Sequence, residues 1–224
     1  MDKGQVTAFV VLGLILLAVV GGVAYLTQEG STFQRGARDA EIQAKADEVR
    51  NSLVSCLEEA SASAVYTFGL RGLQFVPDAH PRYTSQTLPS LEEIEQFLGR
   101  YVQSAAGCEH EAIVESSEPS IHVALEENQV LFTIDYPVEI LHKGQRARID
   151  DPYTVSLPVR LVYLWGIVKQ ILTSYEKEGR VDMALLASLD LDAGVSVTET
   201  EVVYALHDFY PESNPYVLMF GVGL

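Results

Sequence analysis

The sequence predicts an α+β protein in which an amino-terminal transmembrane helix and an amphipathic stalk helix precede a head with an antiparallel sheet covered by helices. Three observations predict this class. Residues 6–26 carry no charge, a helical apolar stripe follows them, and later strand patterns come in blocks that are separate from the helical patterns. Segregated helices and closely spaced strands are typical of α+β folds.

The uncharged run reads VTAFVVLGLILLAVVGGVAYL. A helix of about 21 residues rises roughly 31 Å, which matches the hydrocarbon core of a bilayer. A secretory signal peptide has a shorter apolar core and a small-residue cleavage site, and residues 25–28 offer no good site. We therefore expect a leader and a transmembrane helix over residues 1–28, with residues 6–26 in the lipid bilayer. Small residues allow close helix packing, and in this run they are Ala18, Gly21 and Gly22.

The residues before the apolar run carry a more specific pattern, Lys3-Gly4-Gln5 followed by Val6 to Val10. A basic leader, then Gly, Gln and an apolar helix, resembles the class III signal peptide of archaeal type IV pilin-like proteins. The resemblance implies that a leader peptidase cuts between Gly4 and Gln5 and leaves the apolar helix on the mature chain. Pilins often carry Glu at the fifth mature position, which is Phe9 here, and this difference favours anchoring over polymerisation. The layout also resembles uncharacterised single-helix surface proteins of small-genome archaea; an ordinary anchor beginning Lys-Gly-Gln is the alternative.

The charge of the chain excludes one class of partner. With 31 acidic and 15 basic residues, the net charge is −16, and such a surface repels nucleic acid. The same composition fits either an ordinary acidic surface or adaptation to salt.

The orientation of the chain in the membrane is a separate question. A strict count of the basic residues on each side of the apolar run places the carboxyl side in the cytoplasm, but long domains translocate largely regardless of charge. We expect a single-pass protein of the cell membrane with its head outside the cytoplasm.

The two cysteines, Cys56 and Cys108, form no CxxC motif. Cys56 falls on a predicted helix and Cys108 just past the end of another. Outside the membrane they predict a disulfide between the two segments, which would stabilise the fold by about 2–4 kcal/mol. Two unrelated buried thiols are the alternative.

Two helices are expected before the strands. Apolar residues recur at helical spacing from residue 36 to 66, which predicts an amphipathic stalk over 29–66. Residues 68–87 are rich in Gly, Pro and aromatic residues and predict a loop. Ser90 and Glu93 then form a capping box for a helix that ends at Gly107. The stalk stripe consists of Ile42, Ala46, Val49, Leu53, Cys56, Leu57 and Ala60.

The head is predicted over residues 67–224 and forms one folding unit with the stalk. Alternating apolar residues predict strands over 121–125, 130–140 and 153–159, close enough for an antiparallel meander. Helices are expected over 160–177 and 183–189. A hairpin of strands 195–207 and 216–222, joined by residues 208–215, ends the chain.

The search for chemistry yields no catalytic, cofactor-binding or metal-binding residue. The densest group, Cys108-Glu109-His110-Glu111, matches neither an HExxH nor a paired CxxC spacing. His207-Asp208 is interpreted as a polar surface pair at a strand end, and Asp190 and Asp192 as a helix end. GxSxG, Walker and GxGxxG motifs are absent from the sequence.

These observations favour a membrane-anchored, non-enzymatic, extracytoplasmic surface protein that is pilin-like, and a filament subunit is the first of two hypotheses for its role. The alternative is an anchored binding or assembly module that does not polymerise. Expected partners are the lipid bilayer, further copies of the chain or a membrane protein, and the leader peptidase. A membrane-anchored enzyme is the third hypothesis, and nothing in the sequence supports a catalytic constellation.

Overall fold

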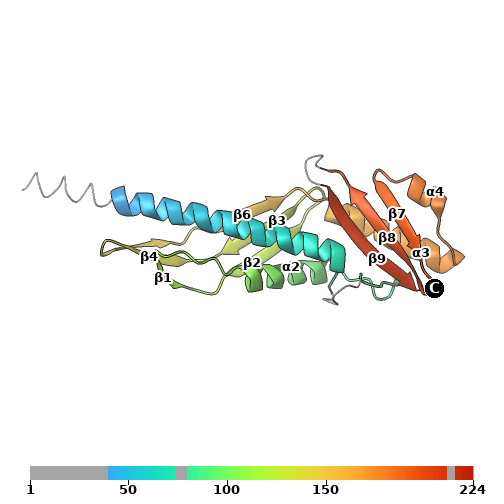
Figure 1. The fold of residues 1–224 in the computed structure, drawn as a ribbon, viewed down its shortest axis with the longest axis horizontal. Coiled ribbons are helices and arrows are strands. Elements are labelled where there is room, and N and C mark those ends of the chain that lie inside the picture. Colours follow the sequence, from blue (N-terminus) through green and yellow to red (C-terminus); the bar gives the residue numbers. More distant parts are fainter. Residues whose placement is uncertain (1–39, 74–79, 211–214, 224) are drawn as a thin grey trace, which may run out of the picture.

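The computed structural model describes residues 40–73, 80–210 and 215–223. This part of the chain combines helices with antiparallel sheets, which confirms the α+β class (Figure 1). The predicted membrane helix 6–26, the cleavage position at Gly4 and Gln5 and the packing residues Ala18, Gly21 and Gly22 lie outside the described residues. Among the helices that are described, none combines the length and the apolar character that a membrane crossing requires.

A long helix covers residues 40–71 and runs along most of the molecule (Figure 1). Its predicted apolar stripe is confirmed, because Val49, Leu53 and Leu57 are almost completely buried. The predicted end at residue 66 is wrong, since the stripe continues through Phe68, which is fully buried within the helix rather than in a loop. Gly72, at φ +59°, ends the helix, and its N–H donates to the Phe68 carbonyl at 2.7 Å.

Helix α2 (Leu91–Ala105) begins with the predicted capping box of Ser90 and Glu93. Its buried face consists of Ile94, Phe97, Leu98 and Val102. The helix packs on strand β2 (Ser120–Leu125). The half-buried Glu95 also accepts a hydrogen bond from the Leu125 N–H at 3.0 Å, which ties the helix to the end of that strand.

The three predicted strands of the meander are present. Only the middle one is divided, into β3 and β4, and the structure adds two strands that were not predicted, β1 before β2 and β5 before β6. One half of the meander is the sheet β1-β4-β5 and the other is β2-β3-β6, and both are antiparallel. The breaks between the two sheets fall at Pro119, Pro137 and Pro152, where the missing N–H interrupts the ladder. The prediction of one continuous strand over 130–140 is therefore wrong, although its alternation holds, since Ile134, Tyr136 and Val138 are all buried. The strands not yet bounded are β1 (Ile113–Ser116), β3 (Val130–Asp135), β4 (Val138–His142), β5 (Gln145–Ile149) and β6 (Tyr153–Leu157).

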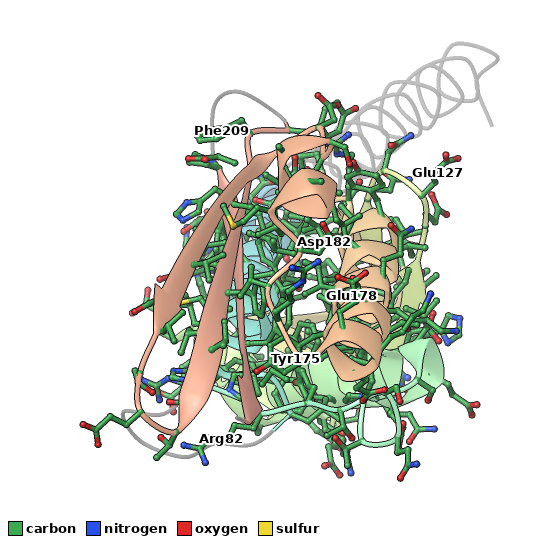
Figure 2. All side chains as sticks on the ribbon, turned by 90° about the vertical axis from the view of Figure 1, so that its right-hand side faces the viewer. Arg82, Glu127, Tyr175, Glu178, Asp182 and Phe209 are labelled. Atoms are coloured by element: carbon green, nitrogen blue, oxygen red, sulfur yellow. A yellow bond between two sulfur atoms is a disulfide. The ribbon has the colours of Figure 1, made fainter. Side chains whose placement is uncertain are left out.

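A second layer forms around the carboxyl-terminal sheet, β7 (Asp192–Val197), β8 (Glu201–Asp208) and β9 (Tyr216–Gly223), in the order β7-β8-β9. The predicted strand 195–207 is two strands, because residues 198–200 form a turn between β7 and β8. Helices α3 (Leu161–Glu178) and α4 (Met183–Ala187) lie on one side of this sheet (Figure 2).

The long helix meets the carboxyl-terminal sheet near β9. A Cβ atom on Gly69 would lie 2.4 Å from the Val217 carbonyl oxygen, so only glycine permits this approach. The Tyr216 hydroxyl is buried beside it and donates to the Val65 carbonyl at 3.1 Å. Trp165 of α3 packs against Phe68 at 5.6 Å and donates to the Pro89 carbonyl at 2.9 Å. One hydrophobic core therefore joins the long helix, the meander and the carboxyl-terminal layer.

The predicted disulfide is confirmed. Cys56 on the long helix is bonded to Cys108 just beyond α2, and their Cα atoms lie 5.9 Å apart. The bond fixes the middle of the long helix to the end of the shorter one. The alternative of two separate buried thiols is thereby excluded.

Candidate functional site: three polar clusters around the core

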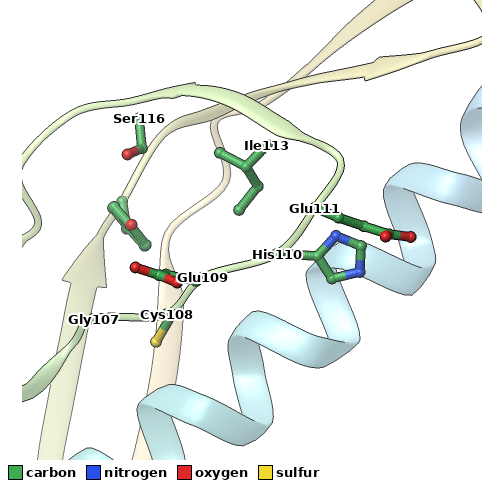
Figure 3. A pocket seen from close by; sticks show the side chains of 8 residues that line it. Gly107, Cys108, Glu109, His110, Glu111, Ile113 and Ser116 are labelled. Atoms are coloured by element: carbon green, nitrogen blue, oxygen red, sulfur yellow. The ribbon is translucent and has the colours of Figure 1, made fainter.

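An open pocket of about 580 Å³ lies beside the disulfide, where the chain leaves α2 and enters β1 (Figure 3). Figure 3 shows His110 on the side of the long helix, whereas Glu109 lies on the side of Ser116. Glu109 and Glu111 are exposed, so the pocket is acidic and open to solvent. The lining residues are Gly107, Cys108, Glu109, His110, Glu111, Ile113, Ser116 and Tyr136.

The geometry of His110 is that of a structural residue. Its Nδ1 accepts a hydrogen bond from the Ala112 N–H at 3.1 Å, so the remaining proton of the neutral ring lies on Nε2. Nε2 lies 4.0 Å from a Glu48 carboxylate oxygen on the long helix. Glu48 also pairs with Lys45 at 2.8 Å, and this hydrogen bond holds the pKa of the Glu48 carboxyl below its usual value. His110 thus links the loop after α2 to the helix.

The pocket offers no metal-binding set. The disulfide removes Cys108 as a ligand, because a metal requires the thiolate. Across the described residues, His, Cys, Asp and Glu side chains form no group of three or more that could hold a metal ion. The exposed carboxylates on the lining of the pocket are Glu109 and Glu111.

A second cluster joins the chain after residue 79 to the carboxyl-terminal sheet. Glu201 accepts from Arg82 Nε at 2.7 Å and lies 3.2 Å from His80 Nε2. Burial alone would raise the pKa of the Glu201 carboxyl, but the hydrogen bonds from Arg82 and His80 outweigh it and lower the pKa. The Tyr83 N–H also donates to the Gly221 carbonyl at 3.0 Å, so this cluster holds the segment against β9.

The third cluster is a buried ion pair at the end of β8. Asp208 is completely buried, and its two oxygens accept from Arg160 Nη2 at 2.6 Å and Nε at 3.0 Å. The guanidinium carbon lies over the rings of both Tyr163 and Tyr210, at 4.7 Å and 5.3 Å from their centroids. The hydrogen bond to Asp208 raises the pKa of Arg160. An open pocket of about 360 Å³ adjoins the pair, with Asp190 and Asp192 on its wall.

Interpreting His207-Asp208 as a surface pair was wrong for Asp208. The alternation of β8 explains why Asp208 is buried. Val202, Tyr204 and Leu206 face inward, and Asp208 is the next residue in this series. A carboxylate at an inward position requires a cation. Because Arg160 lies 48 residues away in the sequence, the local pattern around Asp208 gave no indication of this partner. Both Asp190 and Asp192 are exposed, but only Asp190 lies in the turn after α4, because Asp192 is already the first residue of β7.

Comparison with known proteins adds no relative, since no family model, no curated protein and no solved structure matches this chain.

The three clusters therefore share one role in the described structure, which is to fasten loops and strand ends to the core. In each of them the His, Arg or carboxylate contacts another charged group or a backbone N–H.

Proposed function

We propose that this chain is a membrane-anchored extracytoplasmic surface protein, in which residues 6–26 lie in the bilayer and the described residues form an exposed head. The observation that carries the proposal is the Cys56–Cys108 disulfide. Disulfides persist in oxidising compartments and are rare in the reducing cytosol. Both cysteines of the chain are used in this bond, so the head fits an environment outside the cytoplasm.

The order of the segments supports the same proposal. The described part of the long helix begins at residue 40, shortly after the apolar run ends at Leu26. An apolar helix followed by an amphipathic one that bears a head is also the layout of the pilin-like proteins that residues 3–10 resemble. Processing by a leader peptidase between Gly4 and Gln5 therefore belongs to the proposal.

Between a filament subunit and an anchored module that does not polymerise, the outward face of the long helix favours the second. Apart from Leu70 near its carboxyl end, its exposed positions are polar or small, and they form no apolar stripe on which a neighbouring helix would pack. Self-association in the membrane would then rest on residues 6–26, where Ala18, Gly21 and Gly22 permit close packing. The exposed residues over the first five described turns include Glu41, Gln43, Asp47, Glu48, Asn51, Ser52, Ser55 and Glu58.

We assign the head a binding or structural role rather than a catalytic one. The central side chains of the polar clusters, His110, Glu201, Arg160 and Asp208, make ion pairs and backbone hydrogen bonds, as in a scaffold. A hydrolase screen on the purified full chain tests this assignment, and turnover that is lost in a His110→Ala variant would overturn it.

The first experiment is mass spectrometry of the amino terminus of the chain recovered from native membranes. A terminus at Gln5 supports leader processing and the pilin-like reading, whereas an intact Met1 overturns the processing step and leaves a plain anchor. A thiol-reactive, membrane-impermeant reagent on intact cells tests the exposure of the head. We expect Cys56 and Cys108 to be labelled only after mild external reduction, and labelling that requires lysis would overturn the extracytoplasmic location.

A further inference from the structure

We propose that the outer edge of β7 accepts an extended, basic segment of a partner protein as a fourth strand, and that the adjoining acidic pocket binds a basic side chain of that segment. This inference goes beyond the proposed function and is independent of how residues 6–26 are placed. Two separate observations carry it, the open edge of the strand and the composition of the pocket at its start.

β7 is the outermost strand of its sheet and the one farthest from the long helix (Figure 1). It pairs with β8 in regular register from Asp192↔His207 to Val197↔Val202. Within the described ranges, no strand pairs with its other side. Val197 at its end is 65% exposed, which is a high value for a valine in a strand. The edge therefore presents unpaired backbone groups beside an uncovered apolar side chain.

The other sheet edges carry protective features that natural proteins use against strand addition, whereas the charge at Asp192, at one end of β7, is the only such feature on that strand. Lys, Arg, Pro, bulges and covering segments block an edge, whereas β7 reads DAGVSV with an unbroken register. Arg82 forms a bridge with Gly221 on the edge of β9, and Glu95 of α2 accepts a hydrogen bond from the Leu125 N–H at the end of β2. The remaining edges have a register shift in β1, Arg146 and Arg148 in β5, and Pro152 and Pro158 beside β6.

The pocket at the Asp192 end of β7 is suited to a cation. Phe209 and Tyr210 are 52% and 46% exposed at its wall. Arg160 is the one basic residue on the pocket lining, and it pairs with the buried Asp208 at 2.6 Å and lies 3.9 Å from Asp190, so the three carboxylates leave the pocket with excess negative charge. Carboxylates beside aromatic faces attract guanidinium and ammonium groups. Because Asp192 is also the first residue of β7, one extended segment can contact both the edge and the pocket.

Charge favours a basic partner over a second copy of this chain. Pairing two β7 strands would bring Asp190, Asp192 and Glu199 of both copies to one interface, between chains of net charge −16 each. Like charges at an interface oppose association, and complementary charges favour it. In antiparallel addition, the partner residue opposite Asp192 lies at the carboxyl end of its strand, so the basic residue is expected there.

The test uses the full chain in detergent micelles and a fluorescein-labelled hexapeptide of sequence Thr-Val-Thr-Val-Thr-Arg, followed by fluorescence anisotropy. We expect saturable binding that weakens at least tenfold in Val197→Lys, which adds a charge to the edge, and at least tenfold in the double variant Asp190→Asn/Asp192→Asn. Val114→Lys is the matched control, because Val114 is a 48% exposed valine on an edge strand of another sheet. It should bind the peptide like the unchanged chain.

Two altered peptides separate strand addition from simple charge attraction. A peptide with Glu in place of Arg should bind at least tenfold more weakly, and one with N-methyl groups on alternate residues should lose binding, because its backbone donors are removed. Equal binding of either peptide would overturn the proposal, as would no binding of the Arg peptide at millimolar concentration. A dimer in sedimentation equilibrium that Val197→Lys abolishes would assign the edge to a second copy instead. Matching thermal unfolding of both Lys variants shows that folding is not the cause.

Discussion

At the scale of single residues, the pair of Asp208 and Arg160 shows how a charge is kept inside this fold. Asp208 accepts both hydrogen bonds of a guanidinium and a third from the Tyr210 N–H at 3.2 Å. The guanidinium carbon of Arg160 lies over the rings of Tyr163 and Tyr210. Removing one member of a buried ion pair leaves the charge of the other member without a partner inside the protein, and this destabilises the fold strongly.

We predict that Asp208→Ala lowers the free energy of unfolding by about 3 kcal/mol, because Arg160 would lose its main partner in a mostly buried position. Urea unfolding followed by circular dichroism measures the effect. Asp190→Ala is the matched control, since Asp190 lies 3.9 Å from the same guanidinium but its side chain is 94% exposed. Its change should stay within about 0.5 kcal/mol, and equal losses in both variants would contradict the buried-pair argument.

We predict that the Glu201 carboxylate makes a contribution to the free energy of unfolding that is lost in acid. Its pKa is lowered from a usual value of 4.5 by Arg82 and His80, despite the opposing effect of burial. A lowered pKa in the folded state means that the ionised carboxylate stabilises the fold above pH 4.5, and that this contribution is lost as the pH falls through the lowered pKa. The stability difference between the unchanged chain and Glu201→Gln should therefore be largest near pH 7 and shrink toward pH 3.

Urea titrations at several pH values measure that difference. Glu199→Gln provides the control, because Glu199 is exposed in the turn before β8 and its replacement should have little effect at any pH. A Glu201→Gln difference that stays constant from pH 7 to pH 3 would show that the carboxylate charge does not contribute.

At the scale of elements, the disulfide joins Cys56 on the long helix to Cys108 just beyond α2, and these two cysteines are 52 residues apart in the sequence. A crosslink over a loop of this size restricts the unfolded chain, so we predict that the double variant Cys56→Ser/Cys108→Ser loses about 2–4 kcal/mol of stability. Urea unfolding of the two proteins measures the loss. Reduction of the unchanged chain should produce a similar decrease and leave the double variant unaffected; unchanged stability after reduction would contradict the prediction.

The elements that depend on local pattern were the ones that the sequence predicted well. The capping box at Ser90, the stripe of the long helix and the alternation of the middle meander segment are all local features, and the structure contains them. The predictions were wrong where contacts between distant segments determine the bounds of an element. The extension of the long helix depends on Gly69 meeting β9, and the breaks at Pro119, Pro137 and Pro152 divide the meander into two sheets.

The candidate site was less predictable for the same reason. Cys56 and Cys108 could be paired from the sequence because only two cysteines exist. Arg160 with Asp208, and Arg82 with Glu201, are pairs across 48 and 119 residues, and each chain segment alone gives no indication of its partner. Strand alternation identifies Asp208 as an inward carboxylate, but only the packed fold identifies the cation that makes this burial tolerable.

At the scale of the whole molecule, the net charge of −16 acts against the compact state. Exposed ion pairs such as Arg50–Asp151 and Arg148–Asp150 involve side chains on the surface, and such pairs contribute about 0–1 kcal/mol each. Repulsion among the remaining carboxylates should outweigh them. Salt shortens the range of that repulsion, from about 10 Å at 0.1 M to about 3 Å at 1 M.

We therefore predict that the urea midpoint of the full chain rises when sodium chloride is increased from 0.1 M to 1 M. The variant Glu58→Lys/Glu59→Lys is the informative comparison, because both residues are exposed on the long helix and each change adds two positive units, which moves the net charge from −16 to −12. Its midpoint at 0.1 M salt should be higher and its gain from salt smaller. A midpoint that falls with salt would mean that the surface ion pairs stabilise the molecule more than its excess negative charge destabilises it.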